Sequence, residues 1–341
     1  MAEPETTIPK GSLVLVTGAT GSLATHVIKA FLERGYKVRG TVRDLAKASW
    51  LVDDLFKTYA DRGDFELAVV RTLADQNAFD EVVKGVSAIA HVASIVTFDS
   101  DPNKVIPQTV LGATSILEAA LKEPSVREFV YTSSIAAAVM PMLGNSVHVT
   151  KDTFNDTAVQ LAWAVPTSGG VVYMASKTEA EKAVWRFVED KKPHFTVNSV
   201  GPSSIIGQPL HKSHVDSAGA WLKQLYDGDR VALTSTPAMY TVDVKDAAQL
   251  HVAAVVDPEV KNERLQAWAS NTNWNGLLAI MRRQYPDRKF IDDLPGLGEL
   301  SVTSDFTQPL GLLKKWAGQD GWKSLEETVA DNMDGILAFS P

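Results

Sequence analysis

The sequence contains no cysteine among its 341 residues. This absence excludes disulfide bonds, catalytic thiols and thiolate metal sites, and it fits a reducing compartment. No apolar run approaches the roughly 20 residues that a membrane-spanning helix needs, and the polar, acidic N-terminus is unlike a signal or transit peptide. We therefore expect a cytoplasmic protein that does not span a membrane.

Basic charge is also scarce, with 33 Lys and Arg against 41 Asp and Glu and a net charge of -8. A protein that binds a nucleic-acid backbone needs a basic surface, so the composition argues against that class. His211 and His214 are close in the sequence, but no third ligand is evident nearby. We expect them in a surface loop and predict no metal site.

Apolar segments and helical patterns alternate through the first 200 residues. Strands are predicted at residues 12–18, 36–42, 65–70, 88–93, 128–134 and 195–200. Helical segments are predicted at residues 22–35, 46–62, 76–84, 105–122 and 173–189. Continuous apolar strands separated by helices indicate a parallel sheet covered on both faces, so we predict a doubly wound α/β fold with a Rossmann domain over residues 1–200.

The pattern becomes less regular after residue 200. Residues 201–341 are predicted to form a smaller, partly interleaved substrate-binding lobe, with some strands and helices returning to the Rossmann core. Residues 141–170 lack a strong period. Long irregular stretches inside compact domains are commonly functional lids or disordered segments, which is our expectation here.

A glycine-rich turn follows the first predicted strand directly, in the sequence TGATGSLA. Gly18 permits the tight turn, Gly21 lets a pyrophosphate approach the helix N-terminus, and Ala24 occupies the third small position. A simple strand-to-helix turn is the alternative interpretation. The predicted cofactor contacts here are Thr17, Gly18, Gly21, Ser22 and Leu23.

The end of the second predicted strand indicates which nucleotide binds. Thr41 lies where an NAD-selective protein usually has an acid for the ribose hydroxyls. Arg39, Arg43 and Lys47 surround it, and such a cluster suits the 2′-phosphate of NADP. Asp44 could neutralise Arg43, and a solvated charged loop is the alternative. We predict NADP.

A tyrosine and a lysine lie four residues apart at Tyr173 and Lys177, within a segment that is predicted to be helical. Positions four apart share one helix face, where the ammonium would lower the pKa of the phenol. Such pairs also arise by chance. Tyr285 and Lys289 are an example, because Pro286 disfavours a continuous helix through both.

The motifs TGATGSLA, VRGTVR, HVAS, YTSS, YMASK and PSSIIG occur in one order along the chain. In this order the chain resembles the extended short-chain dehydrogenases/reductases, nearest to the fungal NADPH-dependent aldehyde and carbonyl reductases and the plant dihydroflavonol reductases. The resemblance implies that Ser134 hydrogen-bonds the substrate carbonyl and that Tyr173 donates the proton. It further implies that Lys177 binds the nicotinamide ribose.

The resemblance extends to other residues of the site. Thr72 and Leu73 stand where many members have an acid for the adenine, so packing is expected to replace it. Further cofactor contacts are expected from Ala93, Ser94, Pro202, Ser203 and Ser204. The expected substrate pocket consists of Phe98, Met140, Pro166, Trp221, Met239 and Tyr240, although each alone is more often a core residue.

The sequence therefore predicts an NADPH-dependent reductase of hydrophobic or aromatic aldehydes, ketones and keto esters, acting as a monomer or homodimer on a small carbonyl compound. A nucleotide-sugar epimerase or dehydratase of the same fold is one alternative. It would use arginines in the C-terminal lobe, which has few: Arg230, Arg264, Arg282, Arg283 and Arg288. A non-catalytic NADP-sensing regulator is the other.

Overall fold

The computed structural model describes residues 4–164, 166–216, 220–229 and 237–339. Its larger sheet has seven strands in the order β10-β7-β5-β4-β1-β2-β3, and every pairing is parallel. The strands are β1 Leu13–Val16, β2 Lys37–Val42, β3 Phe65–Val69, β4 Ala88–His91, β5 Glu128–Thr132, β7 Thr196–Pro202 and β10 Arg264–Ala267. The predicted doubly wound sheet is confirmed.

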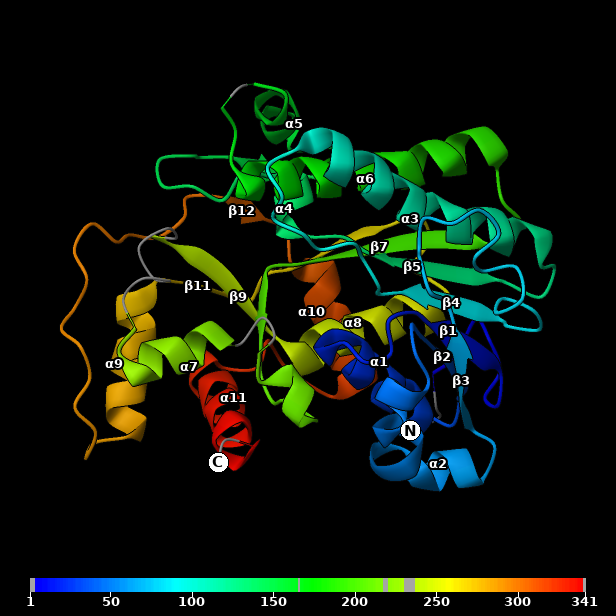
Figure 1. The fold of residues 1–341 in the computed structure, drawn as a ribbon, viewed down its shortest axis with the longest axis horizontal. Coiled ribbons are helices and arrows are strands. Elements are labelled where there is room, and N and C mark those ends of the chain that lie inside the picture. Colours follow the sequence, from blue (N-terminus) through cyan, green and yellow to red (C-terminus); the bar gives the residue numbers. More distant parts are fainter. Residues whose placement is uncertain (1–3, 165, 217–219, 230–236, 340–341) are drawn as a thin grey trace.

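Long helices cover both faces of this sheet (Figure 1). The helices α1 (Ser22–Glu33) and α8 (Val244–Val256) pack together on one face. The helices α3 (Pro102–Lys122) and α6 (Gly169–Lys191) pack together on the other. Crossover helices on both faces bury the sheet, which explains its continuous apolar strands.

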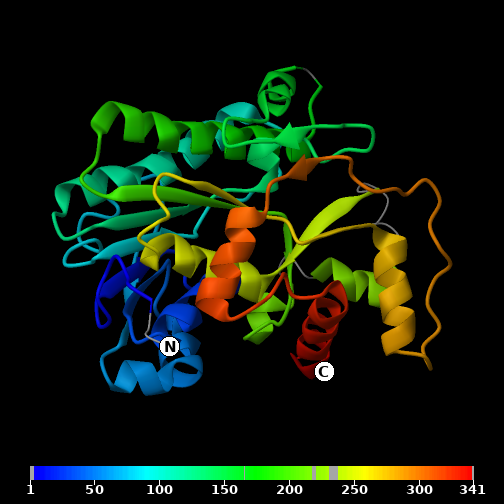
Figure 2. The ribbon, with the colours of Figure 1, turned by 180° about the vertical axis from the view of Figure 1, so that it is seen from behind.

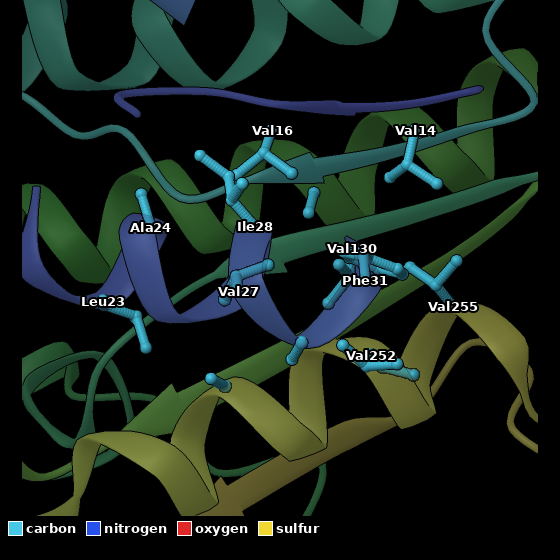
Figure 3. Close-up of a cluster of buried hydrophobic side chains, with 14 of the residues drawn as sticks. Val14, Val16, Leu23, Ala24, Val27, Ile28, Phe31, Val130, Val252 and Val255 are labelled. Carbon is cyan, nitrogen blue, oxygen red and sulfur yellow. The ribbon is translucent and has the colours of Figure 1, made fainter. Parts of the chain in front are cut away.

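The inner face of α1 lies between β1 and α8, with Ala24, Ile28 and Phe31 pointing into their shared core (Figure 3). Ala24 is 2% exposed, so a larger side chain would force the helix away from the strand. This packing fixes the N-terminus of α1 beside the end of β1. Packing therefore fixes the position of the glycine turn that joins β1 to α1.

A second sheet organises the C-terminal lobe, with β9 (Met239–Asp243) between β8 (Ser204–Ile206) and β11 (Ser270–Thr272). Around it lie α7 Ala220–Asp227, α9 Trp274–Gln284 and α11 Leu325–Phe339. The helix α10 (Thr307–Ala317) packs against α8 on the back of the molecule (Figure 2). Because β10 joins the large sheet and β11 the small one, this part of the chain serves both lobes; the domain boundary near residue 200 stays a prediction.

One helix predicted from the sequence is divided into short pieces, and another is wrong. Residues 46–62 form three short pieces, η1 Ala46–Ala48, the π-turn η2 Leu51–Leu55 and α2 Lys57–Asp61. Phe56 interrupts them, because its amide bonds the carbonyl of Leu51, five residues back. Residues 76–84 form successive turns, and Asn77 lies in the left-handed region at φ 63°, which a helix cannot contain.

The stretch 141–170 has more structure than its sequence suggested. Its strand β6 (His148–Val149) pairs in parallel with β12 (Thr303–Ser304), far along the chain. It also contains α5 (Asp156–Ala162), which packs against α6. The stretch that we expected to be a lid or a disordered segment therefore contains regular structure, and its helix α5 packs against α6.

Candidate active site

The turn after β1 is built around Gly18, whose φ of +71° favours glycine. A Cβ there would lie 3.0 Å from that of Ala93, so space also restricts the position. The Gly18 amide donates to the Thr41 hydroxyl at 3.1 Å. Thr17 accepts the Ala93 amide at 2.9 Å and contacts His91 Nδ1 at 3.0 Å. Thr17 thus stabilises the turn through its contacts with Ala93 and His91.

The N-terminus of α1 points its first amides out of this turn. Gly21 is the N-cap and provides no side-chain cap, and the first turn holds no acidic residue. Amides and the helix dipole at such an end favour an anion. Ser22 and Leu23 begin the helix here, so the structure brings the predicted phosphate contacts together.

The basic cluster predicted around Thr41 divides into two parts. Arg39 pairs with Glu66 at 2.6 Å and donates to the carbonyls of Val82 and Lys84 at 2.9 Å each. Its guanidinium is thereby engaged by β3 and by the turns at residues 76–84, so Arg39 is no longer expected to contact the 2′-phosphate.

Arg43 and Lys47 are exposed beyond the carboxyl end of β2. Asp44 accepts the amides of Ala46 at 2.9 Å and Lys47 at 3.3 Å, which caps the short turn that follows. Among the described ion pairs, Arg43 and Asp44 do not pair. The two cations therefore remain available for a phosphate.

A small cavity between β4 and α3 is lined by three predicted cofactor residues, Leu73, Ala93 and Ser94, together with Thr109 and Tyr131. The Leu73 carbonyl is held by the Ser115 hydroxyl at 2.7 Å. Thr72 precedes Leu73 on the same exposed segment. This side of the predicted adenine and nicotinamide site is assembled from the loops after β3 and β4, the helix α3 and the strand β5.

The predicted residues Pro202, Ser203 and Ser204 link β7 to β8 at the carboxyl end of the large sheet. Ser203 is 7% exposed, and its amide and hydroxyl donate to the Ala267 carbonyl at 3.1 and 3.3 Å. These bonds fix the link between the two lobes. A direct cofactor contact by these residues stays a prediction.

Ser134 follows β5 and caps α4 (Ile135–Ala138), accepting the Ala136 amide at 3.2 Å. Tyr173 lies in the first turns of α6, and its phenol lies close enough to the Ser134 hydroxyl for that hydroxyl to lower the pKa of the phenol. The structure thus brings together two residues that are distant in sequence at the carboxyl end of a parallel strand, where open α/β sheets bind ligands.

Lys177 lies one turn after Tyr173 and is only 4% exposed. Its ammonium donates to the Thr132 carbonyl at 3.3 Å. Burial lowers the pKa of Lys177 to about 8, while the nearby Glu181 carboxylate acts to raise it. A buried ammonium with one carbonyl partner retains donors for a further ligand.

The phenol does not follow the sequence prediction of a lowered pKa. Burial raises the pKa of Tyr173 above its ordinary value, and the Ser134 hydroxyl acts against this. The Lys177 ammonium points to Thr132 and does not outweigh desolvation. Tyr173 is therefore protonated at neutral pH.

Among the predicted pocket residues, Phe98 is closest to the chemistry, with its ring centroid 5.4 Å from that of Tyr173 and 68% exposure. Pro166 is exposed and Met140 is buried. Trp221 and Met239 lie in the apolar core of the C-terminal lobe, and the Tyr240 hydroxyl donates to the Val302 carbonyl at 2.9 Å. A pocket role for these five stays a prediction.

The sequence reasoning missed a buried ion pair beneath the site, Glu181 with Arg264, at 2.9 Å. Glu181 stands four residues after Lys177, a spacing that could have drawn attention to it. Arg264 offered no such signal because it lies 83 residues further along the chain.

The histidine prediction was partly wrong. His214 is 3% exposed, accepts the Leu210 amide at 3.2 Å and contacts the Thr20 carbonyl at 3.2 Å. His211 stacks on Trp50 with ring centroids 3.8 Å apart. The pair attaches the C-terminal lobe to the glycine turn. Within the described residues, no group of three possible metal ligands occurs.

Comparison with known proteins shows the family to which this chain belongs. The model of the NAD dependent epimerase/dehydratase family matches residues 14–266. The chain belongs to this family. The match covers the glycine turn, Ser134, Tyr173 and Lys177, and it extends into β10.

Members of this family with similar sequences carry reductase names. Aldehyde reductase 2 of Sporidiobolus salmonicolor is 38% identical, over 95% of this chain and 96% of the relative. The ketoreductase adrE of Penicillium rubens is 36% identical, over 94% and 96%. The family also includes the NAD-dependent epimerase/dehydratase terH of Aspergillus terreus, 39% identical over 94% and 96%.

Among solved structures, Gre2 from Candida albicans in complex with NADPH superposes with a TM-score of 0.84 at 26% identity. The match covers 97% of this chain and 100% of that one. These comparisons confirm the resemblance on which the sequence prediction of an NADPH-dependent reductase rested. In the part of the chain that the structure describes, no helix has the length and apolarity to cross a membrane.

Proposed function

We propose that the protein reduces aldehydes and ketones to alcohols with NADPH, acting on hydrophobic or aromatic carbonyl compounds and keto esters. The observation that carries this proposal is the placement of the Tyr173 phenol near Ser134, one helical turn from the buried Lys177, whose ammonium donates to the Thr132 carbonyl beside Ser134 in the chain. The reductase names of the similar proteins and the NADPH in the Gre2 complex agree with it.

The residues of the site suit the cofactor. The uncapped N-terminus of α1 offers amides to the pyrophosphate, and Gly18 leaves room for the turn. Arg43 and Lys47 are placed to bind the 2′-phosphate. Lys177 has ammonium protons left for the ribose hydroxyls. When bound, NADPH supplies the hydride.

Two hydroxyls then serve the substrate oxygen. Ser134 donates a hydrogen bond that stabilises the charge developing on this oxygen. Tyr173 donates the proton, and its raised pKa keeps it protonated over the neutral range. Phe98, beside the phenol, offers an apolar wall to a hydrophobic substrate.

The paired arginines of the C-terminal lobe disfavour the nucleotide-sugar alternative. Arg282 pairs with Asp293, Arg283 with Glu326, and Arg288 with Asp227, while Arg264 pairs with Glu181. Arg230 lies outside the described residues. A lobe with its described arginines engaged is poorly equipped for a sugar diphosphate. A non-catalytic regulator is disfavoured because a proton donor and a buried lysine are retained.

The first prediction tests the proton donor. Tyr173→Phe removes one hydroxyl and keeps the ring, so turnover should fall at least about a hundredfold while NADPH still binds. Tyr285→Phe is the control, because Tyr285 follows the last residue of α9 and packs on Tyr226. Turnover and NADPH dissociation constants are measured for both. A Tyr173→Phe enzyme that keeps most of its activity would contradict the role of Tyr173 as proton donor.

The substrate class is tested by NADPH consumption with aromatic aldehydes, keto esters and UDP-sugars. We expect turnover with the first two only. We further propose a cytoplasmic enzyme that is a monomer or homodimer, to be tested by cell fractionation and by light scattering after size-exclusion chromatography. Activity with a UDP-sugar alone would favour the epimerase or dehydratase alternative.

A further inference from the structure

One buried carboxylate lies beneath the proposed catalytic residues. Glu181 is 2% exposed and accepts four short hydrogen bonds, besides a longer one at 3.5 Å from Trp185 Nε1 on the same helix. The hydroxyls of Ser133 and Ser199 donate to it at 2.8 Å each, and Arg264 donates through Nε and Nη2 at 2.9 Å each. A carboxylate with every lone-pair direction used is a rigid anchor.

The four bonds join elements that carry the proposed catalytic residues. Ser133 immediately precedes Ser134 at the end of β5, and Glu181 follows Lys177 by one turn of α6. Lys177 in turn donates to the carbonyl of Thr132. The end of β5 and the middle of α6 are therefore joined twice, by residues that directly precede Ser134 in the chain and residues that follow Tyr173 on α6.

Arg264 extends this anchor to the loop before α5. Its Nη1 donates to the carbonyls of Lys151 at 2.6 Å and Thr153 at 2.9 Å, and its guanidinium lies 4.1 Å from the centroid of the Phe154 ring. The neighbouring Asn155 amide group donates to the Ala136 carbonyl at 2.8 Å, within the helix that Ser134 caps. The ion pair thus holds the chain on both sides of Ser134.

We propose that Glu181, held by Arg264, is a positioning residue: its carboxylate fixes Ser134 against Tyr173 and keeps Lys177 charged for the cofactor and the phenol. This inference rests on the proposed reductase function. Glu181 is enclosed by Ser133 after β5, Ser199 within β7 and Arg264 at the start of β10, so we place it outside the substrate and cofactor contacts.

The charges around Lys177 agree with this role. Burial lowers the pKa of Lys177 to about 8, and the Glu181 carboxylate acts in the opposite direction. Burial and Lys177 together lower the pKa of His91 to about 3, so that imidazole is neutral. The titratable groups facing Lys177 are His91 on β4, Tyr131 on β5, and Tyr173 and Glu181 on α6. Glu181 is thus its source of negative charge at neutral pH.

The test removes the negative charge of Glu181 and keeps the shape of its side chain. In Glu181→Gln the pKa of Lys177 should fall further, so the ammonium is lost at lower pH. We expect the pH above which NADPH binding weakens to move down by about one unit, with the alkaline limb of kcat/KM moving alongside it. NADPH binding is followed directly by fluorescence, and the melting temperature is recorded for each variant.

The matched control is Glu179→Gln on the same helix. Glu179 is partly exposed and lies 3.8 Å from Lys182 and 4.0 Å from Arg186. Its variant should keep the wild-type pH profiles. If Glu181→Gln folds and also keeps them, the proposal is wrong.

A second variant covers the case in which Glu181→Gln does not fold. Ser133→Ala removes one hydroxyl and leaves the ion pair, so Ser134 should lose part of its support. We expect kcat to fall about tenfold with the NADPH dissociation constant unchanged, and a wild-type kcat would overturn the positioning role. If no carbonyl compound is turned over by the wild type, the proposed function fails, but the pH profile of NADPH binding still tests Glu181.

Discussion

Arg39 and Arg43 begin from the same prediction and end in different surroundings. Both lie on or just after β2, yet Arg39 is tied to Glu66 and to two carbonyls, whereas Arg43 is exposed beyond the strand. Four residues along a strand span about 13 Å. Of these two arginines, we therefore propose that Arg43 contacts the 2′-phosphate.

This difference gives a prediction for cofactor choice. The wild type should bind NADPH at least tenfold more tightly than NADH, about 1.4 kcal/mol. Arg43→Ala should weaken NADPH and leave NADH nearly unchanged, because only NADPH carries the 2′-phosphate. Dissociation constants of both cofactors provide the measurement.

Arg39→Ala serves as the comparison. It should lower the melting temperature, since Glu66 and two carbonyls lose a partner, and should leave the preference for NADPH intact. Equal losses of NADPH and NADH affinity in Arg43→Ala would contradict the phosphate assignment.

At this scale the sequence was most informative where spacing is local. Gly18 and Gly21, or Tyr173 and Lys177, are close in the chain, so their geometry follows from one turn or one helix. The effective pKa of Tyr173 was not predictable in that way. It depends on how deeply the phenol is buried, and only the packed structure sets this.

Among the elements, the contact between α6 and the segment carrying Phe98 is the tightest near the site. A Cβ added to Gly169 would lie 1.9 Å from the Phe98 carbonyl oxygen. At the neighbouring Gly170 the nearest atom to such a Cβ is the Ser168 hydroxyl at 3.9 Å. The start of α6 therefore fixes the position of Phe98 beside Tyr173.

Gly169→Ala should displace the Phe98 segment and change KM for bulky aromatic carbonyl compounds by roughly tenfold, about 1.4 kcal/mol. NADPH affinity should change little, because the proposed phosphate contacts lie at α1. Gly170→Ala, whose added Cβ meets only the Ser168 hydroxyl at an ordinary van der Waals distance, should match the wild type. Steady-state kinetics over a series of aromatic aldehydes measures the difference, and identical KM values in both variants would remove Phe98 from the pocket.

Element types were predicted best where burial is continuous. Six of the seven strands of the large sheet and the helices α1, α3 and α6 were recognised, because each has a long apolar face, whereas the edge strand β10 was not located. Residues 46–62 and 76–84 failed because their turns depend on single backbone choices, at Phe56 and Asn77, that apolar periodicity does not reveal.

At the scale of the whole molecule, we expect Glu128 to make the free energy of unfolding depend on pH. It is 6% exposed at the start of β5, and burial raises its pKa to about 8. The unfolded chain releases this proton near pH 4.5. The folded state therefore holds more protons between these values, and stability falls as the pH rises from about 4.5 to about 8.

Glu128→Gln should flatten this dependence and raise the melting temperature most at pH 8 and above. Melting curves between pH 5 and 9 provide the test. Glu118→Gln, which removes one charge from an exposed ion pair with Lys191 on the helical face, is the control. If the melting temperature of Glu128→Gln depends on pH in the same way as that of the wild type, Glu128 does not hold this proton in the folded state.

The position of β10 at the edge of the large sheet has a consequence for biosynthesis. Arg264 leaves the ribosome 83 residues after Glu181. A nascent chain that ends before β10 can already form β1, α1 and the glycine turn between them. Its Glu181 has no guanidinium, and the loop at Lys151 and Thr153 has no donor to hold it. The nucleotide-binding half can therefore form during translation, whereas the face that carries Ser134 and Tyr173 is completed only after the C-terminal lobe has begun to emerge.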